Sequence, residues 1–296
     1  MDASRGLPSS THTHRIWSAD EKMKLLILAF DGLEVELVER WRLKALKQMV
    51  YGTYEAPRSP HFKKPYTPSV WATIITGKSQ EEHGIDDWWT YGRLLDRLRY
   101  LPPFVWIKNK RRILWKLGLK PRIVDKRDHR VETLFDVIKP SKALFIPTIN
   151  EPAWIHEEYV EALKHGLENY ISRIWEVHRY RKRVFLQELE KDSEWKLFMV
   201  WFDIADLLGH VCISRCRHQF LKAYLDLDML VKEVKKRLSN DTIMLIVSDH
   251  GMKPMPDGTG DHTDRGFWSL SADIPWFRPR KATDFYTYIV KLLSSG

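Results

Sequence analysis

Short apolar segments recur along the chain, and segments predicted to be helical lie between them. The apolar segments are Lys24–Phe30, Ala143–Ile149, Lys196–Phe202 and Ile243–His250, with a shorter one at Gly266–Leu270. Continuous hydrophobicity over so few residues is typical of parallel strands buried on both faces. The predicted helices are Glu34–Val50, Ser69–Thr76, Thr133–Lys139, Ile155–Leu189, Gln219–Leu238 and Asp284–Leu293. This alternation predicts an α/β fold of the doubly wound type.

Residues 23–296 are predicted to form one domain, because neither an internal repeat nor a linker divides them. A hydrophobic content of 44% and a charged content of 29% are those of a globular protein. Residues 1–22 are mostly polar and lack the apolar core of a signal peptide. We therefore expect a flexible extension there, with Met23 as an alternative start of translation. No apolar run in the sequence approaches the roughly 20 residues of a membrane-spanning helix.

Residues 88–130 do not follow the alternation around them and are predicted to be an insertion near the functional site. This segment is rich in aromatic residues, and from Arg93 to Arg130 it has 13 lysines and arginines against three aspartates. The whole chain has a net charge of +9, so the remainder is close to neutral. A concentrated basic segment attracts phosphates, and residues 93–130 are candidates for contact with nucleic acid or an anionic surface. A solvated surface insertion explains the same composition equally well.

The two cysteines of the chain are Cys212 and Cys216. At four residues apart on a predicted helix they do not suggest a disulfide framework, and they lack the further ligands of a structural zinc site. Such cysteine usage favours a reducing compartment, so we expect a cytoplasmic protein.

Side chains suited to metal ions lie where predicted strands end, or on a loop beyond the last of them. They are Asp31, Asp206, His210, Asp249, His250 and His262. In an open parallel sheet the carboxyl ends of the strands share one edge, so these residues can converge although they are far apart in the sequence. Two divalent ions about 3.5–4 Å apart would use all six, an arrangement that serves phosphoryl transfer.

Thr67 stands just before the predicted helix Ser69–Thr76. At that place a hydroxyl caps the helix or faces an anion that free backbone N–H groups hold. Beside a metal site the same hydroxyl becomes a candidate nucleophile, since coordination activates an alcohol. Ser69 is the alternative.

The sequence resembles the alkaline phosphatase superfamily, and most closely its nucleotide pyrophosphatase/phosphodiesterase branch. The motifs that carry the resemblance are FDG, TPSVWATIITG, EEHGI, DxxGH and SDHG, in that order and followed by a late histidine. The resemblance implies a three-layer α/β/α sandwich around a mostly parallel sheet. It also implies that Asp31, Thr67, Asp249 and His250 hold one metal ion, and that Asp206, His210 and His262 hold the other.

This resemblance predicts a phosphodiesterase or nucleotide pyrophosphatase that forms a phosphothreonine on Thr67. Nitrogen and carboxylate ligands suit Zn²⁺ or Mn²⁺ better than Mg²⁺. The alternatives are a phosphomonoesterase with the same metal site, or a binding protein that engages nucleic acid or an anionic surface through the basic segment.

One departure from the family lies after the HGI motif. The diesterases usually have an asparagine there that contacts a phosphoryl oxygen, whereas this chain has Asp86, Asp87, Trp88 and Trp89. An acidic residue would repel phosphate, so substrate recognition must differ. Trp88 and Trp89 could stack on a base or line the pocket of the leaving group, or they could form the core of the insertion.

Overall fold

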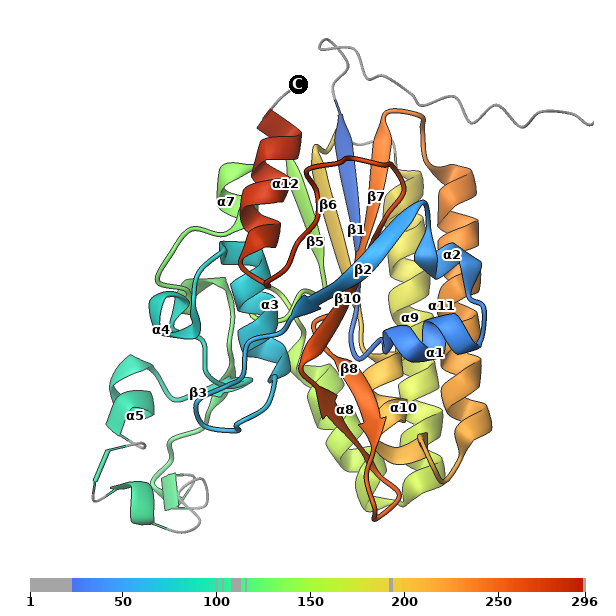
Figure 1. Ribbon diagram of the computed structural model, residues 1–296. Coiled ribbons are helices and arrows are strands. Elements are labelled where there is room, and N and C mark those ends of the chain that lie inside the picture. The colour runs from blue at the N-terminus through green and yellow to red at the C-terminus, as the bar shows by residue number, and fades with distance from the viewer. Residues whose placement is uncertain are drawn as a thin grey trace, which may run out of the picture.

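A six-stranded mixed sheet forms the centre of the computed structural model, which describes residues 23–98, 101–102, 104–107, 113–114, 116–191 and 194–294 (Figure 1). Its strands in spatial order are β2 (Val50–Glu55), β10 (Arg265–Leu270), β7 (Thr242–Val247), β1 (Lys24–Phe30), β6 (Leu197–Phe202) and β5 (Ser141–Leu144). The last four run parallel, and β10 is antiparallel to both of its neighbours. The predicted α/β fold with a mostly parallel sheet is confirmed. The predicted extension at residues 1–22 lies outside the described residues.

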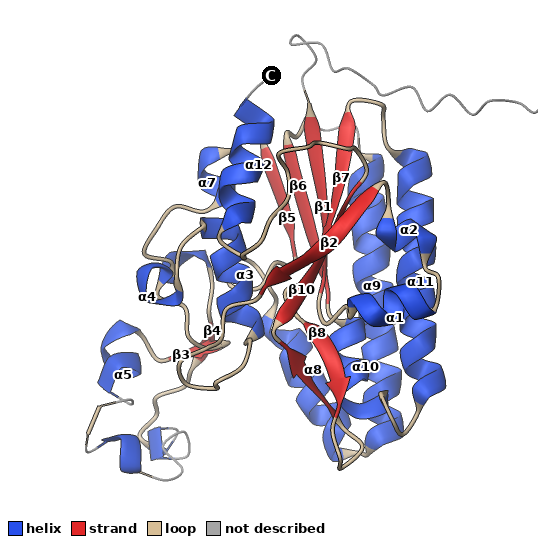
Figure 2. Ribbon diagram, in the orientation of Figure 1, coloured by secondary structure: helices blue, strands red, loops and turns tan. Residues whose placement is uncertain are grey.

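Helices cover both faces of this sheet (Figure 2). Alternate residues of β1 contact the two layers: Leu26, Leu28 and Phe30 pack on one side, and Leu25, Ile27 and Ala29 on the other. The first layer contains α8 (Ala153–Lys164), α9 (Leu167–Glu190), α10 (Ile204–Cys212) and α11 (Arg217–Arg237). The second contains α3 (Thr67–Thr76), α7 (Leu134–Val137) and α12 (Asp284–Ser294). The three layers predicted from the resemblance are therefore present, and burial of each large side chain on β1 contributes about 1.5–3 kcal/mol.

Two predicted helices are each divided, and one predicted strand is shorter than expected. The segment 34–50 forms α1 (Val35–Arg40) and α2 (Lys44–Lys47), because Arg42 and Gln48 have φ angles of 53° and 50°, outside the helical region. The segment 155–189 divides at Gly166, whose φ of 102° is incompatible with a continuous helix. The strand predicted at 143–149 ends at Leu144, since Phe145 has a φ of 61°. These predictions were wrong because hydrophobic periodicity does not report local changes of backbone conformation.

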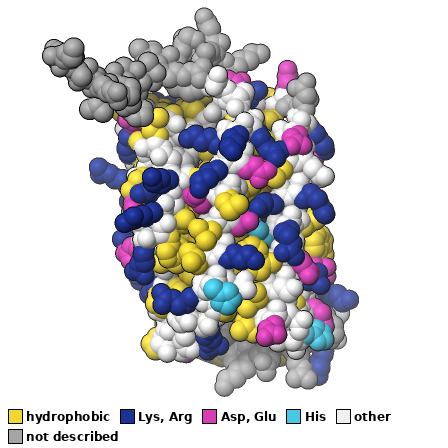
Figure 3. Space-filling view, turned by 90° about the vertical axis from the view of Figure 1, so that its right-hand side faces the viewer, with side chains coloured by type: hydrophobic (Ala, Val, Ile, Leu, Met, Phe, Trp, Pro, Cys, Tyr) yellow, Lys and Arg dark blue, Asp and Glu magenta, His cyan; other side chains and the backbone are white. Residues whose placement is uncertain are grey.

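The outer surface of the α11 side carries basic, acidic and hydrophobic side chains mixed together (Figure 3). Among the described residues, no helix combines the length and the apolar character that crossing a bilayer requires.

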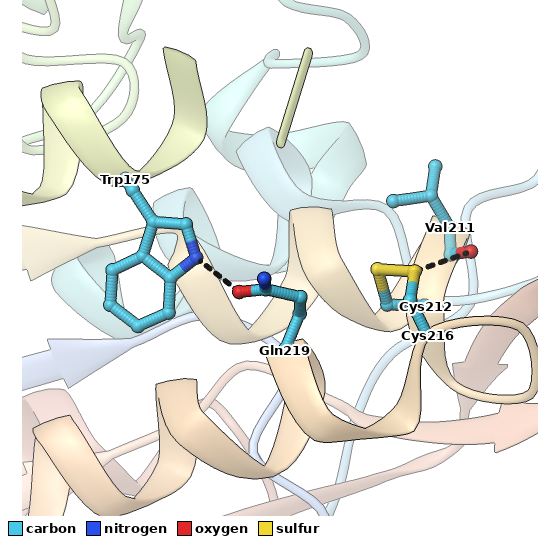
Figure 4. The surroundings of a disulfide bond; sticks show 5 residues. All are labelled: Trp175, Val211, Cys212, Cys216 and Gln219. Carbon is cyan, nitrogen blue, oxygen red and sulfur yellow. Dashed lines mark hydrogen bonds between the residues drawn. A yellow bond between two sulfur atoms is a disulfide. The ribbon is translucent and has the colours of Figure 1, made fainter. Parts of the chain in front are cut away.

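Cys212 and Cys216 form a disulfide with a Cα–Cα distance of 4.3 Å (Figure 4). The expectation that they would not pair was wrong, because they do not lie on one helix: Cys212 ends α10 and Cys216 precedes α11. Close by, Trp175 of α9 donates to the side-chain oxygen of Gln219 on α11 at 2.9 Å. The pairing removes the cysteine-based argument for a reducing compartment, and the cytoplasmic location stays a prediction.

Candidate metal-binding active site

The residues expected to bind metal gather at the edge of the sheet where the parallel strands end. Asp31 follows β1 directly, and Asp249 and His250 come just after β7. Asp206 and His210 lie one turn apart on α10, which begins two residues after β6. His262 was expected on a loop, but it lies on β9 (Gly260–Thr263), which pairs with β8 (Gly251–Pro254). The hairpin carries His262 back over the sheet edge.

The first group consists of Asp31, Asp249 and His250, all of them buried. The Nε2 atom of His250 lies 3.3 Å from Asp31 Oδ1 and 3.3 Å from Asp249 Oδ2. Burial, followed by the charge of Asp249, raises the pKa of Asp31 well above its ordinary value. Burial raises the pKa of Asp249 to about 7 and lowers that of His250 well below its ordinary value. A bound cation would favour the ionised carboxylates and the neutral imidazole, so this environment suits a metal ion.

The second group consists of Asp206, His210 and His262. Asp206 Oδ1 lies 3.3 Å from the Nε2 atom of His210 and 3.4 Å from that of His262. Although burial opposes it, these two histidines hold the pKa of Asp206 well below its ordinary value. Conversely, the charge of Asp206 raises the pKa of His210 to about 9.

The two groups adjoin each other. The rings of His250 and His262 are stacked with their centroids 3.6 Å apart, and His250 Nε2 lies 3.9 Å from Asp206 Oδ1. Gly32 makes this approach feasible, since a Cβ there would lie 2.7 Å from the Cα atom of Asp206. Its φ of 74° is also one that side-chain-bearing residues rarely adopt.

All three histidine rings are oriented by backbone carbonyls that face their Nδ1 atoms. Their Nδ1 atoms lie 2.9 Å from Gly260 O for His210, 3.1 Å from Gly251 O for His250 and 2.8 Å from Pro65 O for His262. A carbonyl oxygen only accepts, so each Nδ1 carries a proton and donates it. The Nε2 atoms, which face the carboxylates, are left as potential metal ligands.

Four buried carboxylate oxygens have no hydrogen-bond donor among the described residues: Asp31 Oδ1, Asp206 Oδ1 and both side-chain oxygens of Asp249. Leaving such atoms buried without a partner is costly, and native proteins rarely do so. Together with the three Nε2 atoms, they are the nitrogen and oxygen donors that Zn²⁺ and Mn²⁺ accept. The residues present therefore fit two metal ions.

Thr67 is the first residue of α3, and its Oγ1 atom lies 3.3 Å from His250 Nε2. Ser69, the alternative, donates its hydroxyl to Gln80 Oε1 at 2.8 Å. The backbone N–H groups of Ser69 and Val70 donate to Tyr66 O, and Pro68 has none. An anion site built from free N–H groups of this turn is therefore not formed by Ser69 and Val70, and Thr67 is the hydroxyl beside the first metal-binding group.

Residues 86–89, which follow the HGI motif, make hydrogen bonds and ring contacts near the start of α3. Asp86 accepts from Gln80 Nε2 at 2.7 Å, and Asp87 accepts from the hydroxyl of Tyr66 at 3.1 Å. Trp88 is half-buried against the body, with its ring 5.9 Å from that of Trp201 and 4.7 Å from that of His156. Trp89 lies 6.0 Å from the ring of the same histidine. Trp88 thus packs on the central domain, and the two acidic residues serve hydrogen bonds within the protein.

The histidine of the HGI motif, His83, is fully buried and structural. It accepts at Nδ1 from the backbone N–H of Ile85 at 3.1 Å, which leaves the proton on Nε2, 3.2 Å from Thr73 Oγ1. Burial lowers the pKa of His83 to about 3, so the ring is neutral at physiological pH.

A buried charged network beneath the site was not predicted. Arg181 lies among other lysines and arginines of α9, yet its side chain is completely buried. It donates to both carboxylate oxygens of Glu151, at 2.9 and 2.7 Å, and to Asp203 Oδ2 at 3.1 Å. Asp203 also accepts from the hydroxyl of Tyr159 at 2.9 Å and makes no capping bond to α10, the helix that carries Asp206.

A signal for this network is present in the sequence. The buried residues of α9 are Ile174, Trp175, Val177, His178, Arg181 and Phe185. Arg181 continues the apolar stripe at intervals of three and four residues, so helical phase places it inside despite the charges around it.

Replacing Arg181 by methionine is expected to lower the free energy of unfolding by about 3–5 kcal/mol, since it leaves two carboxylates buried without their cation. Urea denaturation monitored by circular dichroism measures this change. The matched control is Arg173→Met on the same helix, where the ion pairs to Glu158 and Glu176 are exposed and worth at most about 1 kcal/mol. Equal effects of the two substitutions would contradict a structural role of the network.

The sequence matches the type I phosphodiesterase / nucleotide pyrophosphatase family over residues 25–270. Among solved structures, murine ectonucleotide pyrophosphatase/phosphodiesterase 5 is similar, with a TM-score of 0.57 at 13% identity, covering 92% of this chain and 95% of that one. An inactive threonine-to-alanine variant of the murine protein in complex with AMP has a TM-score of 0.57 at 12% identity with the same coverage. The human protein has a TM-score of 0.52 at 14% identity, again with the same coverage. At these identities the likeness concerns the fold.

Proposed function

Because the chain belongs to the type I phosphodiesterase / nucleotide pyrophosphatase family, and is thus a hydrolase of phosphoric esters, we propose that it cleaves nucleotide phosphodiesters with Thr67 as the nucleophile. The observation that carries this proposal is the position of the Thr67 hydroxyl, 3.3 Å from His250 Nε2 and beside the group formed with Asp31 and Asp249. A variant of the murine protein in which alanine replaces a threonine is described as inactive, and this supports a nucleophilic role for Thr67.

Two divalent ions would be held by the two groups described above, with Thr67 as a further ligand of the first. When bound, they would lower the pKa of the attacking hydroxyl and of water, and would neutralise charge on the phosphoryl group. The donor set favours Zn²⁺ or Mn²⁺ over Mg²⁺, because imidazole nitrogen is a poor ligand for Mg²⁺.

The residues of this chain support a displacement at phosphorus in two steps. The Thr67 hydroxyl loses its proton as Oγ1 forms a bond to phosphorus, and the bond from phosphorus to the leaving oxygen breaks. The leaving oxygen takes up a proton, so the leaving group departs as an alcohol or phosphate. Thr67 is then a phosphothreonine that keeps the remaining ester substituent. Water attacks the same phosphorus, the bond to Oγ1 breaks, and the free hydroxyl returns with a phosphate monoester as product. Positioning of the nucleophile supplies much of the rate, since α3 holds the Thr67 hydroxyl beside the first group.

Nucleotides are the proposed substrate class, supported by the AMP in the murine variant. Trp88 and Trp89 are proposed to line the pocket of the base or leaving group, in place of the asparagine usual in the family. Aromatic rings stack on a nucleobase without needing a charge, which accommodates the acidic residues beside them.

The test compares bis-p-nitrophenyl phosphate with p-nitrophenyl phosphate, using metal-stripped protein to which Zn²⁺, Mn²⁺ or Mg²⁺ is returned. We expect metal-dependent cleavage of the diester with a kcat/KM at least about tenfold above that of the monoester, because a site that keeps an ester substituent loses contacts when the substituent is absent. The opposite ratio would assign a phosphomonoesterase. Tight metal binding without turnover of these compounds or of a dinucleotide would favour a binding protein.

A further inference from the structure

The described residues between 91 and 121 belong to an arm that is held on a two-stranded stalk. The stalk pairs β3 (Trp89–Thr90) with β4 (Arg122–Ile123), and the N–H of Val124 donates to Trp88 O at 2.9 Å. The arm includes α5 (Arg93–Leu98) and a short 3₁₀ helix (Phe104–Trp106), and it projects from the body at the lower left of Figure 1. It leaves the body on the side where the parallel strands end.

Charge is separated along this insertion. Residues 97–120 contain eight lysines and arginines and no aspartate or glutamate. The three acidic residues of the segment lie at or next to the stalk: Asp96 accepts from Tyr91 N at 3.2 Å, and Asp125 and Asp128 accept from Arg122 at 3.1 and 2.8 Å. The charged residues in the sequence from 97 to 120 are therefore all basic.

The same arm exposes large apolar side chains. In the described part of the arm they are Leu94, Leu101, Phe104, Trp106, Ile107, Ile113, Leu117 and Leu119. Trp106 is 74% exposed, and Leu94 and Leu117 are 72% and 70% exposed. A soluble surface carries such residues singly, whereas a concentration of them marks an interaction site.

We propose that this arm docks on an anionic lipid bilayer. Lysine and arginine are attracted to acidic headgroups, each with about a fivefold gain in affinity, while Trp106 and the leucines enter the interfacial region. Because the segment is positively charged, a negatively charged surface is its complementary partner. Six of the eight exposed apolar side chains named above are aliphatic and cannot stack on bases. A bilayer therefore fits the described part of the arm better than a nucleic acid, which binds through aromatic stacking and phosphate contacts.

Sedimentation with vesicles tests the proposal on the full chain. Vesicles of phosphatidylcholine with phosphatidylserine should bind the protein at least about tenfold more tightly than phosphatidylcholine alone, with binding that weakens as salt is raised. Trp106→Ala combined with Leu117→Ala should reduce vesicle binding about tenfold. Both side chains are largely exposed, so the variant should keep its thermal midpoint.

Lys116→Glu with Lys120→Glu should reduce binding at least as strongly. The matched control is Lys235→Glu with Lys236→Glu, two exposed lysines on α11 that change the net charge equally. Equal losses in the two pairs would show that net charge alone acts and would overturn the arm as the docking site. Absence of vesicle binding, or retention of the protein on RNA but not on vesicles, would overturn it as well.

Discussion

Thr67→Ala should abolish turnover of the phosphodiester, with kcat falling by about 10³-fold or more. The substitution removes the oxygen that forms the covalent bond to phosphorus, and no second hydroxyl can replace it, because Ser69 is engaged with Gln80. Steady-state hydrolysis of bis-p-nitrophenyl phosphate measures the loss. The content of bound metal should fall much less than activity, since the carboxylates and histidines remain.

Two matched variants separate the nucleophile from the fold. Thr67→Ser keeps a hydroxyl at the same place and should retain measurable activity, whereas Ser69→Ala should cost little beyond one hydrogen bond, about 1 kcal/mol of stability. Acid quenching during turnover should trap the phosphorylated peptide that contains Thr67. If Ser69→Ala removed the activity and Thr67→Ala spared it, the roles assigned to the two hydroxyls would be reversed.

Much of this architecture is predictable because the strands carry a strong local signal. The run at 24–30 is apolar at nearly every position, and the structure has a strand with those bounds. Residues placed after such strands converge by topology alone, which is why Asp31 and Asp249 could be expected together although more than 200 residues separate them. The prediction needed only the rule that parallel strands end at one edge.

Other features depend on tertiary contacts that no local pattern encodes. The strand β2 lies at the sheet edge and pairs with β10 through Tyr54 and Gly266, a partner supplied by a distant segment. Arg181 looked like a surface charge because its neighbours are basic, and only Glu151 and Asp203, brought close by the fold, make its burial tolerable.

Removing divalent metal should destabilise the protein markedly, and its return should restore both stability and activity. Three carboxyl groups are buried within the two groups of ligands. Without cations these carboxyl groups either repel one another as carboxylates or stay protonated. A ligand present at 1,000 times its dissociation constant stabilises the folded state by about 4 kcal/mol, so each ion can contribute that much. Differential scanning calorimetry before and after chelation measures the shift of the thermal midpoint.

The number of metal ions bound per chain tests the two ligand groups separately. We expect about two Zn²⁺ or Mn²⁺ ions per chain from elemental analysis, in keeping with two separate ligand groups. His262→Gln should reduce this to about one, because the glutamine keeps the size of the side chain but does not reproduce the Nε2 ligand of the second group. His165→Gln is the control, since this histidine is exposed at the end of α8 and should not affect the count. If both variants bound two ions, His262 would not be a ligand. If the His262 variant bound no ion, the two groups would bind their ions only together, a coupling that the stacked rings of His250 and His262 would explain.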